Sequence, residues 1–125
     1  MSSNGAFQFG RPSGVRFAEI TDGLSNTILV GEKHVALNKF GIGWCDCSTY
    51  NGDYPTCSGR AGGPNFPLAA TLDDPGWKFG SYHTGVVQFA MGDGGVRRLS
   101  VTIDPSTLAL LCDRADGQVI PDYGQ

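Results

Sequence analysis

The chain has 125 residues, of which 40% are hydrophobic and 17% charged, a length and composition that fit one globular domain. The formal net charge is −3, and Arg97-Arg98 is the sole arginine pair, so nucleic acid is not expected as a partner. No apolar run reaches the roughly 18 residues of a transmembrane helix. The first residues lack the features of a signal peptide, so we expect a mature or trimmed form, or an earlier segment outside this sequence.

The nineteen glycines and seven prolines predict a loop-rich fold. Residues 1–13 are interpreted as a polar N-terminal arm, residues 14–120 as one globular domain and residues 121–125 as a tail.

The first half of the chain has two candidate strands. Residues 27–33 contain a β-branched run that is apolar on both faces for four residues, which predicts a central strand covered on both sides. Residues 41–47 are a second candidate. Residues 48–77 show no sustained period and predict a long ordered loop, anchored by Cys57, Phe66 and Trp77. Loops of this length are uncommon in compact domains and are often functional.

The last third predicts a β-hairpin followed by a helix. Apolar and polar residues alternate over 86–91 and again over 98–103, with a glycine-rich turn between them. Asp104 and Pro105 form a helix start, and Gly117 is the expected stop. Three residues share the apolar face of this helix, which should pack on the hairpin: Leu108, Leu111 and Cys112. The predicted class is therefore α+β, with an antiparallel sheet, a C-terminal hairpin and a packed helix.

Four cysteines, Cys45, Cys47, Cys57 and Cys112, allow three pairings, and disulfides in an oxidising compartment are favoured. Free buried thiols are the main alternative, and the spacing does not suit zinc. A Cys47–Cys57 bridge would close the loop between them. Cys45 would then pair with Cys112.

His83 and Asp93 could be taken for a catalytic pair, but the predicted strand between them places them at opposite ends of an extended segment. We expect Asp93 to order the hairpin turn and His83 to fix the loop that enters the strand. Glu32 and His34, two residues apart on one strand face, could bind a cation or relay a proton. A solvated or ion-paired strand end is the simpler interpretation.

No G-x-S-x-G, Walker or dinucleotide motif occurs, and no enzymatic activity is expected. No cofactor is required. Calcium is the one ion that the residue types suggest, because carboxylates gather in the irregular middle of the chain, although no EF-hand string is present. Its candidate ligands are Asp46, Asp53, Asp73 and Asp74, with Asn51 nearby.

Aromatic residues also concentrate in the loop region, where they could stack on sugars or on a neighbouring subunit, or form a small core under the loop. They are Trp44, Tyr50, Tyr54, Phe66, Trp77 and Tyr82.

Two motifs occur together and in a fixed order. The first is ITDGLSNT at residues 20–27, which runs into VGE at residues 30–32. The second has the form H-x9-DG and consists of His83, Asp93 and Gly94. In this combination the chain resembles the planctomycete-type, pseudopilin-like secreted proteins, whose domain has no assigned function.

The resemblance covers about residues 14–117 and implies an exported α+β head that follows a prepilin-like signal and a long hydrophobic helix, which this sequence lacks. It implies no catalytic residues. The motif positions it marks, without a known role, are Asp22, Gly23, Asn26, Glu32, His83, Asp93 and Gly94.

The leading interpretation is an extracellular structural or assembly subunit, a pseudopilin-like head that self-associates. An N-terminal arm that added a strand to a neighbour's sheet would build a filament if the contact repeated head to tail. The alternative is a secreted calcium- or glycan-binding module.

Overall fold

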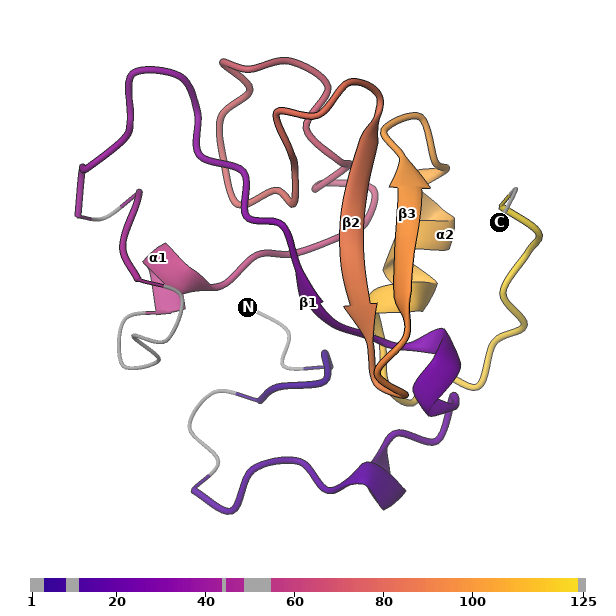
Figure 1. The fold of residues 1–125 in the computed structure, drawn as a ribbon. Helices are drawn as coiled ribbons and strands as arrows, with labels where there is room; N and C mark the ends of the chain where they lie inside the picture. Colours follow the sequence, from indigo (N-terminus) through magenta and orange to yellow (C-terminus); the bar gives the residue numbers. More distant parts are fainter. Residues whose placement is uncertain (1–3, 9–11, 44, 49–54, 124–125) are drawn as a thin grey trace.

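The computed structural model describes residues 4–8, 12–43, 45–48 and 55–123, and Figure 1 shows their arrangement. Three strands, β1 (Ile28–Gly31), β2 (Val86–Met91) and β3 (Val96–Ser100), form an antiparallel sheet. The helix α2 (Pro105–Cys112) lies behind the sheet in this view. A short helix, α1 (Pro55–Ser58), and two 3-10 turns, η1 (Phe17–Glu19) and η2 (Leu24–Asn26), complete the described elements. The α+β class predicted from the sequence is confirmed.

The strand order is β1-β2-β3, so β2 is central and β1 lies at an edge of the sheet. The prediction of a central strand at residues 27–33 is therefore wrong in position and too long. The strand is irregular between Ile28 and Val30, where its register with β2 shifts. As a result, these two side chains, two residues apart, point to opposite faces of the sheet. Ile28 is buried, whereas Val30 lies largely in solvent.

The core lies between the inner face of the sheet and α2. It is formed by buried residues of the strands, the helix and the loop that precedes β2: Ile28, Leu68, Val87, Phe89, Met91, Leu99, Leu108 and Leu111. Only glycine fits at position 31, because a Cβ there would lie 2.6 Å from the rings of Phe79 and Phe89. These two rings meet edge to face, with centroids 5.2 Å apart.

The predicted hairpin is present, and its first strand has the predicted bounds, 86–91. Its second strand lies earlier in the sequence than predicted. Val96 already pairs with Ala90, because the turn is closed tightly by Gly94, which has φ of +85°. Strand β3 therefore begins two residues earlier than predicted and ends at Ser100 instead of residue 103. Val101 and Ile103 keep their apolar role by packing against the core from the connection to α2.

Helix α2 begins as the sequence predicts and ends earlier. The Asp104 carboxylate accepts the Ser106 N–H at 3.0 Å, and Pro105 occupies the first turn. The helix ends at Cys112 and not near Gly117. The Arg114 N–H donates to the Asn4 carbonyl, and the Arg114 carbonyl accepts the Asp22 N–H. These tertiary bonds direct the backbone after residue 112 away from the helix.

The second predicted strand, residues 41–47, is not formed. The N–H groups of Cys45 and Asp46 both donate to the Ile42 carbonyl, which makes this segment a turn. Residue 44 lies outside the described part. Within the predicted loop 48–77, Cys57 is fully buried as expected, whereas Phe66 and Trp77 are half-buried and Leu68 is a stronger anchor.

The predicted Cys47–Cys57 disulfide is present. The predicted Cys45–Cys112 pair is wrong, because both thiols are free. Cys112 packs against the core from the last turn of α2, and a Cβ on Gly62 would lie 2.7 Å from its Sγ. Burial raises the pKa of the Cys112 thiol to about 12, so it behaves as a core residue and not as a nucleophile.

The described part of the N-terminal arm docks on its own chain. Arg114 Nη1 donates to the Gly5 carbonyl at 2.6 Å, and Asn4 Nδ2 donates to the Asp113 carboxylate, also at 2.6 Å. Ala6 is buried. Residues 4–8 therefore attach to the chain that follows α2 and pair with no described strand. No helix in the part described here is long and apolar enough to cross a lipid bilayer.

The disulfide closes a segment of sequence separation 10, and its removal should destabilise the fold by about 2–3 kcal/mol through the entropy of the unfolded chain. We expect this loss for the Cys47→Ala, Cys57→Ala double variant in urea unfolding. Reduction of the wild-type protein with dithiothreitol removes the cross-link without shortening a buried side chain and should give a similar loss. Cys45→Ser is the matched control and should unfold within about 0.5 kcal/mol of wild type. Equal stability of the oxidised and reduced wild-type protein would contradict this expectation.

Candidate functional site

The two sequence motifs meet in space at the hairpin end of β2. The Gly92 N–H donates to the Thr27 carbonyl at 2.9 Å, and the Asp93 N–H donates to the Leu24 carbonyl at 3.0 Å. A Cβ on Gly92 would lie 3.0 Å from the Leu24 carbonyl oxygen, a tight contact that glycine avoids. Carbonyl groups of the first motif thus hold the hairpin turn by hydrogen bonds. The spacing of the motifs in the sequence could not show this contact.

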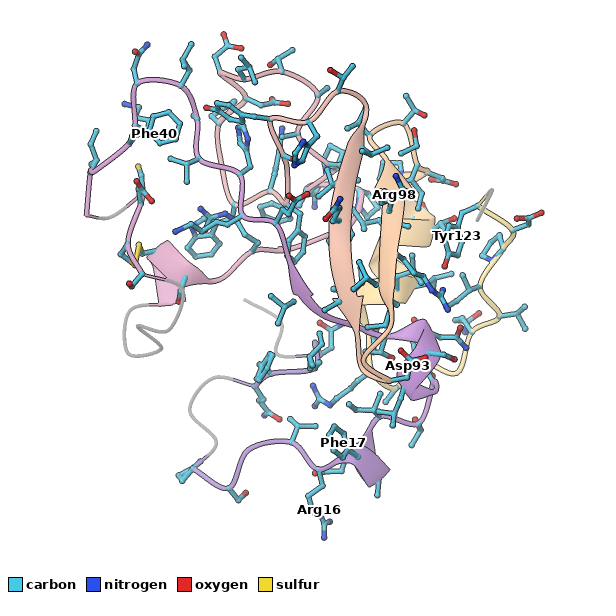
Figure 2. All side chains as sticks on the ribbon, viewed as in Figure 1. Arg16, Phe17, Phe40, Asp93, Arg98 and Tyr123 are labelled. Atoms are coloured by element: carbon cyan, nitrogen blue, oxygen red, sulfur yellow. A yellow bond between two sulfur atoms is a disulfide. The ribbon has the colours of Figure 1, made fainter. Side chains whose placement is uncertain are left out.

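Asp93 orders the turn as predicted. Its carboxylate accepts the Gly95 N–H at 2.8 Å, and Figure 2 places it at the hairpin end of the sheet. His83 precedes the opposite end of β2, so the two residues do not share a site.

Asp22 connects the first motif to the segment that follows α2. Its carboxylate accepts the N–H groups of Asp116 and Gly117, each at 2.9 Å. Burial alone would raise its pKa, but these two N–H groups together lower the pKa of Asp22 below its ordinary value. The next residue, Gly23, has φ of +96°, a conformation that favours glycine. Asn26 Nδ2 closes the turn by donating to the Asp22 carbonyl at 3.3 Å.

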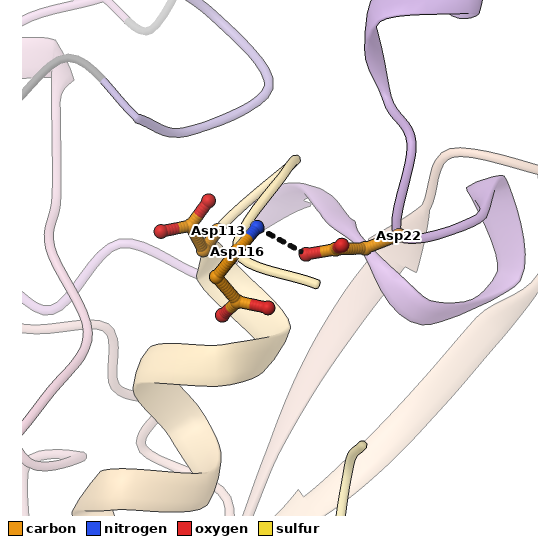
Figure 3. Close-up of side chains that lie close together, drawn as sticks. All are labelled: Asp22, Asp113 and Asp116. Atoms are coloured by element: carbon orange, nitrogen blue, oxygen red, sulfur yellow. Dashed lines mark hydrogen bonds between the residues drawn. The ribbon is translucent and has the colours of Figure 1, made fainter. Parts of the chain in front are cut away.

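Asp22, Asp113 and Asp116 form an acidic cluster that the sequence analysis did not identify (Figure 3). One carboxylate oxygen from each lies within 4.8 Å of the others. The Gln118 N–H favours the charged form of Asp116, yet partial burial and the neighbouring Asp22 carboxylate raise the pKa of Asp116. Because both oxygens of Asp22 already accept backbone N–H groups, the arrangement is explained by the turn it stabilises.

Glu32 and His83 meet at the other end of β1. His83 Nε2 lies 3.8 Å from Glu32 Oε1, and the second Glu32 oxygen accepts the Gln88 N–H at 2.7 Å. The His83 N–H donates to Ser81 Oγ at 3.0 Å, which fixes the loop that enters β2. Glu32 therefore has His83 as its side-chain neighbour at this strand end.

The cation or proton-relay pair of Glu32 and His34 stays a prediction, because the described contacts of the His34 ring lie elsewhere. The ring is buried, and Nε2 lies 2.8 Å from the Asp74 carbonyl oxygen, to which its N–H donates. Nδ1 is buried without a hydrogen-bond partner. Both residues flank one backbone pairing with the segment before β2: the His34 N–H donates to the Lys78 carbonyl, and the Glu32 carbonyl accepts the Gly80 N–H.

A pocket of about 300 Å³ opens beside the Glu32–His83 pair. Its lining combines a carboxylate beside an imidazole, a hydroxyl and aromatic rings. The lining residues are Glu32, Lys33, Val35, Phe40, Gly80, Ser81, Tyr82 and His83.

The calcium candidates do not gather at one point in the described residues. Asp46 lies 3.6 Å from Lys33 Nζ, and Asp74 lies 3.0 Å from Lys78 Nζ while accepting the Ala70 N–H at 2.8 Å. These bonds lower the pKa of Asp74. Asp73 belongs to an exposed turn, and Asp53 lies outside the described residues, as does Asn51.

Of the six aromatic residues in the predicted cluster, three lie in the described part of the chain. Phe66 and Trp77 are half-buried, and Tyr82 is exposed at the pocket. The remaining aromatic residues of the prediction, Trp44, Tyr50 and Tyr54, lie outside the described part.

The outer face of the sheet is a second candidate surface. The register aligns Val30 with Ala90 and Ala90 with Val96, which makes an apolar row across all three strands. Val30 is 55% exposed and Val96 72% exposed. A shallow groove of about 260 Å³ follows this row.

Asp22→Asn should destabilise the fold by about 1–2 kcal/mol at pH 7, since an amide NH₂ cannot accept the second backbone N–H. A lowered folded-state pKa stabilises the fold above the ordinary value of 3.8, and this stabilisation is lost as the pH falls through the lower folded value. The difference in free energy of unfolding between wild type and variant, measured in urea, should therefore become smaller from pH 7 to pH 3. Asp116→Asn, which removes a carboxylate with a raised pKa, is the control and should cost less. A difference that stays constant with pH would refute the assignment.

Residues 1–106 match the family described as "Protein of unknown function (DUF1559)", whose model is named SBP_bac_10. The match contains both sequence motifs and ends within the first turn of α2. No curated protein and no solved structure matches the chain. Because the match covers well over half of the sequence, the chain belongs to the DUF1559 family of unknown function.

Proposed function

We propose that the chain is a non-enzymatic structural subunit, a pseudopilin-like head outside the cell that assembles with copies of itself through the outer face of its sheet. The observation that carries the proposal is the apolar row Val30–Ala90–Val96. Singly exposed apolar residues are common on protein surfaces, but a row that crosses every strand of an open sheet face marks an interaction surface.

The surroundings of the row suit a protein contact. The next cross-strand pair is Gln88 with Arg98, which supplies polar groups along one side of the row. Figure 2 shows Arg98 on β3. An apolar centre beside polar side chains is the usual composition of a protein interface. Strand β1 also lies at an edge of the sheet, where a second chain can add backbone hydrogen bonds.

The disulfide supports a location outside the cytosol, because such bonds form and persist in oxidising compartments. The same location is implied by the resemblance to secreted pseudopilin-like proteins.

The proposed contact replaces the exchange of N-terminal arms that the sequence suggested. Asn4 and Gly5 are already bonded to residues that follow α2 of their own chain. A face-to-face contact of two identical sheets would close a dimer, whereas contact of this face with a different surface would extend a filament.

Val96→Lys should weaken assembly, since it places a charge at one end of the apolar row in the proposed interface. We expect wild-type protein to form dimers or filaments in sedimentation velocity and electron microscopy, and the variant to associate at least about tenfold more weakly. Val119→Lys is the matched control: Val119 is 90% exposed on the C-terminal segment, outside the sheet, and this variant should assemble like wild type. Wild-type protein that stays monomeric up to millimolar concentration, or a Val96→Lys variant that assembles normally, would refute the proposal.

A further inference from the structure

We infer that the pocket between Phe40, Tyr82 and the Glu32–His83 pair binds a neutral saccharide. This inference concerns a surface other than the outer sheet face and does not depend on the proposed assembly. It rests on three properties of the pocket: its aromatic wall, its balanced charge and its size.

The aromatic wall consists of Phe40 and Tyr82. Their rings meet edge to face with centroids 5.9 Å apart, and the side chains are 57% and 49% exposed. The Tyr82 hydroxyl donates to the Val35 carbonyl at 3.0 Å, which fixes the ring at the pocket without help from a ligand. A rigid and exposed aromatic surface loses little conformational entropy on binding and suits the apolar C–H face of a sugar ring.

Glu32 and Lys33, the carboxylate and the ammonium group that line the pocket, already have hydrogen-bond or ion-pair partners. Glu32 faces His83 and accepts the Gln88 N–H, whereas Lys33 Nζ lies 3.6 Å from the Asp46 carboxylate and donates to the Cys47 carbonyl at 2.7 Å. An ionic ligand would have to compete with these partners. Hydroxyl groups, which both donate and accept hydrogen bonds, can add to them without breaking a pair.

Ser81 supplies a complementary polar group. Its Oγ accepts the His83 N–H at 3.0 Å, which leaves the hydroxyl proton for donation to a ligand. Glu32 on the same wall offers carboxylate lone pairs as acceptors for sugar hydroxyls. The pocket therefore combines donors, acceptors and an apolar surface within one side of the molecule.

The volume of about 300 Å³ lies at the lower limit of small-molecule sites and accommodates roughly one or two sugar rings. The ligand class is accordingly the end or a short internal segment of a neutral glycan.

The inference is tested by screening the intact protein on an array of neutral oligosaccharides and titrating the best binder in calorimetry. Phe40→Ala should weaken its binding about tenfold, because it removes half of the aromatic wall. Phe17→Ala is the matched control, since Phe17 is 66% exposed and lies on η1, far from Phe40 in Figure 2. This control should bind within about twofold of wild type.

Glu32→Gln tests the polar wall. Circular dichroism should first show that the variant is folded, and binding of the same oligosaccharide should then weaken. The Val96→Lys variant should bind like wild type, which separates failure of this inference from failure of the proposed assembly. The inference is overturned if no neutral oligosaccharide on the array binds. It is equally overturned if Phe40→Ala binds as well as Phe17→Ala, or if an anionic or cationic ligand binds in preference at this pocket.

Discussion

The architecture depends on the attachment of β2 at both of its ends to one stretch of chain, residues 22–32. At the hairpin end, the carbonyls of Leu24 and Thr27 accept the N–H groups that follow β2. At the other end, the Glu32 N–H donates to the Gln88 carbonyl while the Glu32 carboxylate accepts the Gln88 N–H. Strand β2 supplies three buried core residues, so this attachment fixes the surface against which α2 packs: Val87, Phe89 and Met91. Leu24 and Thr27 of the first motif and Asp93 of the second thus have structural roles in this attachment.

The same attachment creates both candidate surfaces. It holds β1 at the edge of the sheet, which leaves Val30 exposed in line with Val96 on the outer face. It also brings Glu32 next to His83. Both residues line the pocket, together with Phe40. The two surfaces adjoin, because Glu32 contributes to the pocket and to the groove on the sheet. A glycan bound in the pocket would therefore lie close to the proposed contact between subunits.

Local chemistry made parts of the fold predictable. The hairpin, the cap at Asp104 and the turn role of Asp93 all depend on residues close together in sequence, and all three are present. The predictions that were wrong depended on distant contacts. The end of α2 is decided by bonds with Asn4 and Asp22, Cys45 does not pair with Cys112, and the described part of residues 41–47 is a turn. A short segment of mixed pattern has no local feature that distinguishes a strand from a turn.

By itself, the sequence determined the α+β class, the C-terminal hairpin and helix and the positions of the two motifs, and it suggested the Cys47–Cys57 bridge. Alternation, capping residues and short loop closure act over a few residues, and so they can be recognised without coordinates. Only the tertiary structure decided that β1 is an edge strand, that the two motifs touch, and that Phe40, Tyr82 and Glu32 line one pocket. These features join residues that are roughly ten to seventy positions apart, and their pairing depends on the packing of the whole chain rather than on local preference.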